Sequence, residues 1–192
     1  MSGMPVLRFY QWSEPALSIG YFQSVEKTVR AYDCPRQNLW VVRRPTGGGL
    51  VRHGSDLTLS LALPENHPRL AGKVSDSYRA VHTVLRDALL PIFPDLTFSA
   101  CAAPLKARSE RLCFEEPVAC DLESRGVKVV GSSQRRKNSR LLHQTSIQLA
   151  GDPRDMTRRI AAAFETGWGL RFVPSSLTDA EKKSAQSARA AS

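Results

Sequence analysis

The sequence predicts an α+β domain in which a mixed β-sheet is flanked by helices. Leucines alternate with polar or small residues from Leu57 to Leu63, as expected for a strand with one buried face. Apolar residues repeat at helical spacing from Tyr78 to Ile92. Strand spacing returns between Gly126 and Leu149, so we expect the chain to add strands to the sheet after this helix has covered one face of it.

The N-terminal third is rich in predicted strands. Leu7–Trp12 and Ala16–Phe22 lie on either side of the turn-forming Ser13-Glu14-Pro15, and Leu39–Val42 is a third apolar strand. The alternating strand from Leu57 to Leu63 follows, so four strands are expected before the first helix.

Two helices have start and stop signals. Ser75 is the predicted cap of the first, which ends before Pro94. Asp152 is the predicted cap of the second, with Pro153 at its first position and Gly167 as its stop.

The remaining strands belong to the C-terminal half. The segments Gly126–Gly131 and Leu141–Leu149 form a predicted hairpin through Arg136-Lys137-Asn138-Ser139. Shorter strands are predicted at Leu96–Ser99 and Leu170–Val173. Residues 1–178 are thus expected to form one domain. A capping box at Thr178 starts a helix that we expect to fray along the tail, residues 179–192.

Composition limits the possible classes of protein. At 192 residues, 42% of them hydrophobic, the chain can bury one core. No apolar run approaches the ~20 residues of a membrane helix, and the N-terminus lacks a signal-peptide pattern. We therefore expect a soluble, cytoplasmic protein without membrane contact. The cysteines match neither a zinc pattern nor a secreted disulfide framework, so free thiols and no metal site are expected at Cys34, Cys101, Cys113 and Cys120.

The chain is strongly basic. Its formal net charge is +9 and its pI is about 9.8, which favours acidic partners. The basic residues are dispersed, and no nucleic-acid motif or aromatic stacking series accompanies them, so no nucleic acid is expected. An acidic protein surface would suit the same charge, and a merely solvated basic face is the simplest interpretation.

Three consecutive glycines, Gly47, Gly48 and Gly49, stand between two predicted strands. Glycine weakens a strand unless bare backbone must approach something closely, so a ligand contact is predicted, with a tight turn as the alternative. They are not a phosphate loop of the usual kinds, because the Gly-Lys-Ser/Thr ending is absent and a strand follows.

Three further residues could take part in chemistry, and each has a structural alternative. His53 could orient a ligand or move a proton, or be a hydrogen-bonded structural residue. Lys128 could be partly desolvated, with a lowered pKa, or could protect an edge strand. Cys113 could be a nucleophile if a cation lies near its thiol, or a buried inert residue. These alternatives stay open on the residues alone.

Six blocks of the sequence, spread from residue 8 to about 180, resemble in order the signatures of the lipoate/octanoate transfer family, which shares a fold with biotin ligases. The most specific are the Arg-Arg-x-Thr-Gly-Gly and Gly-x-Lys-x-x-Gly-x-x-Gln blocks. The resemblance implies a class II biotin/lipoyl ligase-like catalytic domain over residues 1–178. The six blocks are Arg8-Phe9-Tyr10-Gln11-Trp12, Leu17-Ser18-Ile19-Gly20-Tyr21-Phe22-Gln23, Arg43-Arg44-Pro45-Thr46-Gly47-Gly48-Gly49, Asp56-Leu57-Thr58-Leu59-Ser60, Lys128-Val129-Val130-Gly131-Ser132-Ser133-Gln134-Arg135 and Phe164-Glu165-Thr166-Gly167.

Within this family, Cys113-Phe114, fifteen residues before Lys128, resembles the cysteine of the Gram-positive octanoyl-carrier-protein:protein octanoyltransferases. The resemblance implies that Cys113 accepts an octanoyl group as a thioester while Lys128 contacts the acyl carbonyl and lowers the thiol pKa. It also implies an acyl carrier protein as donor, and a lipoyl domain or glycine-cleavage carrier protein as acceptor, with no ATP. The implied acyl- or substrate-binding residues are Arg44, Gly47, Gly48, Gly49, His53, Gly131, Gln134 and His143.

The sequence also departs from the family. Relatives begin with a further strand and helix, whereas seven residues precede Arg8 here. The third glycine, Gly49, resembles the ATP-dependent lipoate ligases, for which ATP and Mg²⁺ would be needed. Thr145 stands where relatives often have glycine and is expected to narrow the pocket. A lipoate ligase and a non-catalytic acyl or carrier-protein binding module are therefore the alternatives to an octanoyltransferase.

Overall fold

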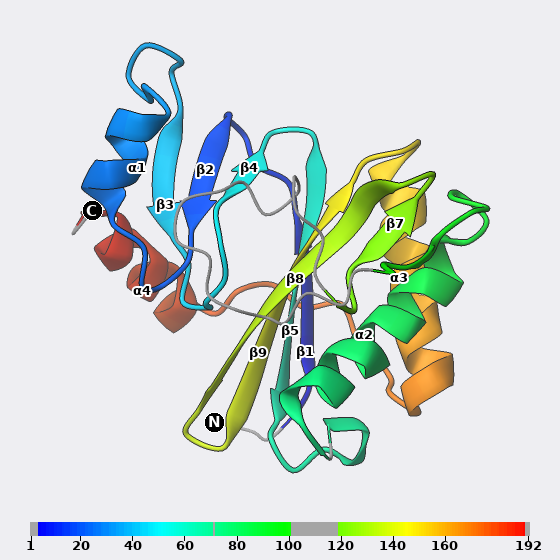
Figure 1. The fold of residues 1–192 in the computed structure, drawn as a ribbon. Coiled ribbons are helices and arrows are strands. Elements are labelled where there is room, and N and C mark those ends of the chain that lie inside the picture. Colours follow the sequence, from blue (N-terminus) through cyan, green and yellow to red (C-terminus); the bar gives the residue numbers. More distant parts are fainter. Residues whose placement is uncertain (1–3, 71, 101–118, 191–192) are drawn as a thin grey trace.

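A six-stranded antiparallel sheet forms the centre of the fold (Figure 1). The structure is a computed structural model that describes residues 4–70, 72–100 and 119–190. The strand order is β1-β5-β9-β8-β7-β6, and all five neighbouring pairs are antiparallel. The strands are β1 (Val6–Tyr10), β5 (Asp56–Pro64), β6 (Thr97–Phe98), β7 (Leu122–Ser124), β8 (Val127–Lys137) and β9 (Arg140–Gln148).

A second sheet of three strands stands beside the first (Figure 1). It consists of β2 (Ala16–Ile19), β3 (Trp40–Arg43) and β4 (Val51–His53). Strand β2 is central, parallel to β3 and antiparallel to β4, so the predicted mixed character belongs to this smaller sheet. Helix α1 (Val25–Ala31), which was not predicted, packs against it after a cap in which the Ser24 side chain accepts a hydrogen bond from the Lys27 amide.

The main core lies between the large sheet and two helices, α2 (Val74–Leu89) and α3 (Pro153–Trp168). The alternation predicted for β5 is confirmed, because all four of its leucines from Leu57 to Leu63 are buried in this core. The opposite face of β5 carries Asp56 and Thr58, which are also buried, on the side of the small sheet.

The helix ends differ in detail from the predictions. Helix α2 starts after Lys73, whose backbone N–H donates to the Asp76 side chain, so Ser75 is not its cap. The Asp152 cap of α3 is confirmed by a hydrogen bond from the Arg154 amide, 2.9 Å long. That helix ends at Gly169 and not at Gly167, because Gly169 has the left-handed φ of 66° that a helix stop needs.

The C-terminal part differs more. The predicted strand at Leu170–Val173 does not form, and the Phe172 amide donates to the Glu165 carboxylate of α3 at 2.8 Å. Beyond it, the Thr178–Glu181 capping box is present and begins α4 (Asp179–Ala190), and fraying of this tail stays a prediction. The 3-10 turn η1 (Pro68–Leu70) completes the elements.

Candidate functional site

The glycine loop joins β3 to β4 and is fixed from within by Arg44. The Arg44 guanidinium donates to the carbonyl oxygens of Gly47 at 2.8 Å and Gly49 at 2.5 Å, and to that of Ser18 on β2 at 2.9 Å. Arg44 is 9% exposed. The Arg44 guanidinium therefore orders the loop backbone. Within the loop, Gly48 has φ of 86°, a backbone conformation that favours glycine.

The same loop is attached to the large sheet through Thr46. The Thr46 Oγ1 atom lies 2.7 Å from Ser133 Oγ on β8 and donates to Gln144 Oε1 on β9 at 2.9 Å. Thr46 is fully buried. The loop thus connects the two sheets.

His53 is also buried between the two sheets. Its Nδ1 atom lies 2.8 Å from Asp56 Oδ2 and its Nε2 atom 2.7 Å from Ser18 Oγ, while its ring stacks on Trp12 with 4.2 Å between centroids. Burial alone would raise the pKa of Asp56, but the hydrogen bond and charge of His53 and the hydrogen bond from Ser146 hold it below its ordinary value. This geometry favours the structural interpretation of His53, and its contact with an acyl group stays a prediction.

Lys128 lies on an internal strand. The edge-strand interpretation is wrong, because β8 pairs with β9 on one side and with β7 on the other. Lys128 is 6% exposed, and its Nζ atom lies 2.7 Å from the Asp121 Oδ2 atom in an ion pair whose side chains are both 4% exposed. Sequence reasoning missed Asp121. The two-residue turn at Arg125 and Gly126, both with positive φ, was the signal for the β7–β8 hairpin that brings Asp121 back to Lys128.

The other predicted binding residues divide between the two faces of the β8–β9 pair. Gln134 Nε2 lies 2.8 Å from His143 Nδ1 on the face covered by α2, and Ser77 of that helix donates to Gln134 Oε1 at 3.0 Å. Strand alternation places Ser133 on the opposite face, toward the glycine loop. Gly131 opposes Ser146 of β9. The structure therefore does not bring all of these residues together, and their substrate contacts stay predictions.

Thr145 lies on the helix-covered face, where its hydroxyl oxygen is 2.8 Å from Ser132 Oγ. It is 2% exposed. Narrowing of an acyl pocket by Thr145 stays a prediction.

Cys113 lies outside the described residues, and its distance from Lys128 is therefore not described either. The described cysteines Cys34 and Cys120 are buried free thiols, and burial raises the pKa of both.

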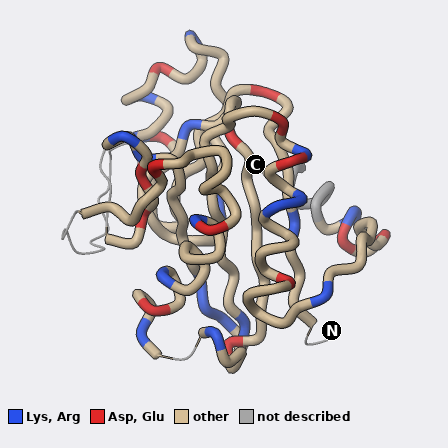
Figure 2. Tube along the Cα trace, turned by 90° about the vertical axis from the view of Figure 1, so that its right-hand side faces the viewer, with Lys and Arg blue, Asp and Glu red and all other residues tan. Residues whose placement is uncertain are grey.

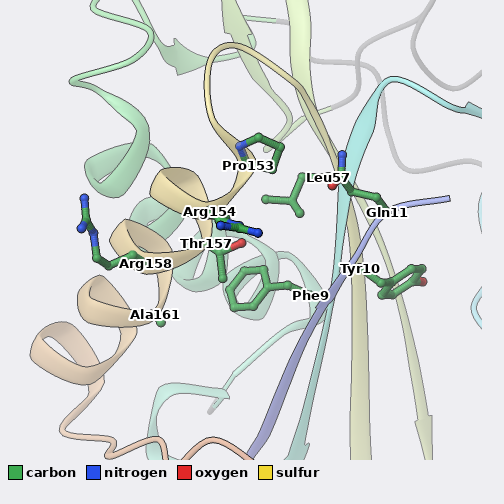
Figure 3. Close-up of a pocket in the computed structure, with 9 residues that line it drawn as sticks. All are labelled: Phe9, Tyr10, Gln11, Leu57, Pro153, Arg154, Thr157, Arg158 and Ala161. Carbon is green, nitrogen blue, oxygen red and sulfur yellow. The ribbon is translucent and has the colours of Figure 1, made fainter. Parts of the chain in front are cut away.

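A separate groove of about 340 Å³ lies between β1 and α3 (Figure 3). Phe9 and Leu57 point toward α3 there, whereas Tyr10 points the other way (Figure 3). Arg154 and Arg158 are the charged residues of its lining. Since Leu57 belongs to the core beneath the helices, this groove lies on the opposite face of the sheet from the glycine loop.

The basic residues are spread over the molecule. Figure 2 shows Lys and Arg distributed along many elements, with Asp and Glu among them. No helix of the described chain is long and apolar enough to cross a membrane. Over the same residues, no group of three or more His, Cys, Asp or Glu side chains is arranged to hold a metal ion.

A family model, described as the lipoyl protein ligase A/B catalytic domain, matches residues 2–169. The chain belongs to this family. Among curated proteins, the chain is 39% identical over 152 residues to the octanoyltransferase LipM of Carboxydothermus hydrogenoformans, a match that covers 78% of this chain and 55% of the relative. It is 36% identical over 154 residues to the LipM of Bacillus subtilis, with coverage of 76% and 54%. The chain thus spans about half the length of these relatives.

Solved structures share the fold of this lipoyl ligase A/B domain. A structure of lipoate-protein ligase A bound with ATP superposes with a TM-score of 0.76 at 17% identity, covering 95% of this chain and 80% of that one. A bipartite lipoate protein ligase from Thermoplasma acidophilum gives a TM-score of 0.69 at 16% identity, with coverage of 95% and 78%. The expected fold class is therefore confirmed.

Proposed function

We propose that this chain catalyses transfer of an octanoyl or lipoyl group to the acceptor lysine of a lipoyl domain through a thioester on Cys113. The observation that carries the proposal is the match to proteins named octanoyltransferase LipM, at 39% and 36% identity over about three-quarters of the chain. The Cys113–Lys128 spacing of fifteen residues supports the same branch of the family.

The proposed reaction has two acyl-transfer steps. The Cys113 thiolate attacks the carbonyl carbon of an octanoyl thioester on an acyl carrier protein, the bond from that carbon to the carrier sulfur breaks, and the carrier leaves as a thiolate. The amine of the acceptor lysine then attacks the octanoyl-Cys113 thioester. An amide forms, and the thiol returns to Cys113. ATP is not needed, because the carrier thioester is already activated.

Lys128 and Asp121 have complementary tasks in this proposal. The Lys128 ammonium would donate a hydrogen bond to the acyl carbonyl oxygen, where negative charge develops during each attack. Asp121, 2.7 Å away and equally buried, would hold the ammonium in place. The glycine loop, ordered by Arg44, would bring backbone against the acyl chain.

Intact-mass measurement after incubation with octanoyl-acyl carrier protein tests the proposal. The wild-type chain should gain one octanoyl group, Cys113→Ser should gain none, and Cys34→Ala should gain one, because Cys34 lies in the core of the small sheet. An adduct that survives in Cys113→Ser, or no adduct on wild type, would contradict the thioester mechanism.

The second candidate is an ATP-dependent lipoate ligase, favoured by the complete glycine triple Gly47–Gly49. It would form a lipoyl-adenylate with ATP and Mg²⁺ and pass the lipoyl group to the same class of acceptor. Lipoate-dependent exchange of pyrophosphate into ATP would reveal this activity. Its presence together with the absence of a Cys113 adduct would favour the ligase.

A further inference from the structure

A chain of side-chain hydrogen bonds runs under α2 from β9 to the turn before β7. The Thr145 hydroxyl lies 2.8 Å from Ser132 Oγ, and Ser132 Oγ lies 2.5 Å from His82 Nε2. The other ring nitrogen of His82, Nδ1, is hydrogen-bonded to the carbonyl oxygen of Cys120. His82 and Thr145 are buried, and Ser132 between them is partly buried.

The direction of each hydrogen bond follows from the donors and acceptors. A carbonyl oxygen can only accept, so His82 Nδ1 carries a proton. Burial, opposed by the Cys120 hydrogen bond and assisted by the Lys128 charge, lowers the pKa of His82 to about 4, which leaves Nε2 unprotonated. Nε2 therefore accepts from the Ser132 hydroxyl, and Ser132 in turn accepts from Thr145. His82 is thus fixed in one tautomer and one orientation.

The carbonyl that His82 binds belongs to a residue with an unusual backbone. Cys120 has φ of 79°, which side-chain-bearing residues rarely adopt and which persists only when neighbouring contacts enforce it. Asp121 follows directly and carries the carboxylate that pairs with Lys128. The orientation of the peptide between Cys120 and Asp121 therefore decides where that carboxylate points.

We propose that His82 is a positioning residue: by holding the Cys120 carbonyl, it directs the Asp121 carboxylate onto Lys128. The inference rests on the proposed function for the catalytic importance of Lys128. The contacts themselves do not depend on it. His82 lies on α2, 46 positions before Lys128 in the sequence, so helix packing is coupled to the placement of the ammonium group.

Two amide substitutions separate the two hydrogen bonds of His82. The side-chain amide of asparagine lies close to where Nδ1 lies in histidine, so His82→Asn keeps a donor for Cys120 but loses the Ser132 contact. The longer glutamine places its amide near Nε2, so His82→Gln keeps a contact with Ser132 and loses the donor for Cys120. Ser132→Ala removes the Ser132 hydrogen bonds to His82 and Thr145 but leaves the Cys120 contact of His82 in place, so it is the matched control.

The readout is the reactivity of the Lys128 amine. Each variant is labelled with limiting acetic anhydride while circular dichroism shows it to be fully folded, and mass spectrometry compares Lys128 with the exposed Lys137 of the same strand. We expect slow labelling of Lys128 in wild type, His82→Asn and Ser132→Ala. His82→Gln should label Lys128 about tenfold faster, the effect of losing one hydrogen bond.

A purely structural role for His82 would give a different result. Both amide variants are expected to lose stability, so labelling that is equally fast in both, or unchanged in both, would overturn the proposal. The labelling uses neither the octanoyl donor nor the acceptor of the proposed reaction. If wild type forms no octanoyl adduct, the proposed function fails while the labelling result still stands. If the adduct forms, the rate of octanoyl transfer per protein molecule should fall in His82→Gln and not in His82→Asn.

Discussion

A Cβ atom placed on Gly20 would lie 2.1 Å from the carbonyl oxygen of Gly48, so the backbone after β2 runs directly against the glycine loop. The clash is with backbone, which cannot swing away as a flexible side chain can. The close approach predicted from the glycine triple therefore has a partner within the chain, whatever else contacts the loop.

Gly20→Ala should destabilise the protein by about 2 kcal/mol or more, because the loop or β2 must move to admit the methyl group. Gly47→Ala is the control within the loop itself. Nothing lies within 4 Å of a Cβ at Gly47, so its free energy of unfolding should change by less than about 1 kcal/mol. Urea unfolding of both variants measures the difference, and equal losses would contradict this account of the loop.

Asp121→Asn should cost about 3 kcal/mol of folding free energy, because it leaves the buried Lys128 ammonium without its carboxylate. The exposed pair of Asp95 and Arg125, 3.1 Å apart, provides the control. Asp95→Asn should cost less than about 1 kcal/mol, since water already screens that pair. Thermal or urea unfolding in which the two substitutions cost the same would show that the Asp121–Lys128 pair does not form.

Arg44→Lys should loosen the glycine loop although it keeps the charge. A lysine ammonium lacks the planar fork that reaches the carbonyl oxygens of Gly47, Gly49 and Ser18 together. We expect a loss of about 2 kcal/mol and faster hydrogen exchange at the loop amides. Arg43→Lys changes an exposed neighbour and should leave exchange in the loop unaltered.

Acid should destabilise the protein before its carboxylates are protonated. The ordinary pKa of histidine is 6.5, whereas burial and the Lys128 charge lower that of His82 to about 4 and burial lowers that of His143 well below 6.5. Between these values the unfolded chain binds protons that the folded chain does not. The free energy of unfolding should therefore keep the whole of this contribution above about pH 6.5 and decrease as the pH drops below that value.

His82 alone should account for about 3 kcal/mol of this loss, complete near pH 4. Urea unfolding from about pH 7.5 down to 4 measures the slope. His82→Asn removes one titrating group, so its stability should depend less on pH than that of wild type. Asp56 adds a loss at still lower pH, because its depressed pKa stabilises the fold only while the carboxylate is ionised. Parallel curves for wild type and His82→Asn would contradict the assignment.

Local patterns predicted much of the fold. The hairpin between β8 and β9 turns at Asn138 and Ser139, both with positive φ, as a two-residue hairpin turn requires. The alternation of β5 and the Asp152 cap of α3 could be predicted equally well, because each depends on residues close in sequence. Helix α1 was missed, since its seven residues are too few to show a convincing apolar period.

The site was less predictable, because its contacts depend on which strands become neighbours. The sequence gives no sign that Arg44 turns inward, nor that Asp121 reaches Lys128 past an irregular register in β7–β8. Strand alternation also separated residues that one motif had grouped together. Gln134 ends the Lys128 block yet lies under α2 with His143, away from the glycine loop.

Ser132 and Ser133 are consecutive in β8, and their side chains serve opposite faces of the sheet. Ser133 contacts Thr46 of the glycine loop, and Ser132 contacts His82 of α2. Inserting or deleting a single residue just before them would exchange their faces and break both contacts at once. We therefore expect this stretch of β8 to tolerate changes of residue type far better than changes of length. The number of residues between Lys128 and Ser133 determines which face of the sheet each later side chain of β8 serves.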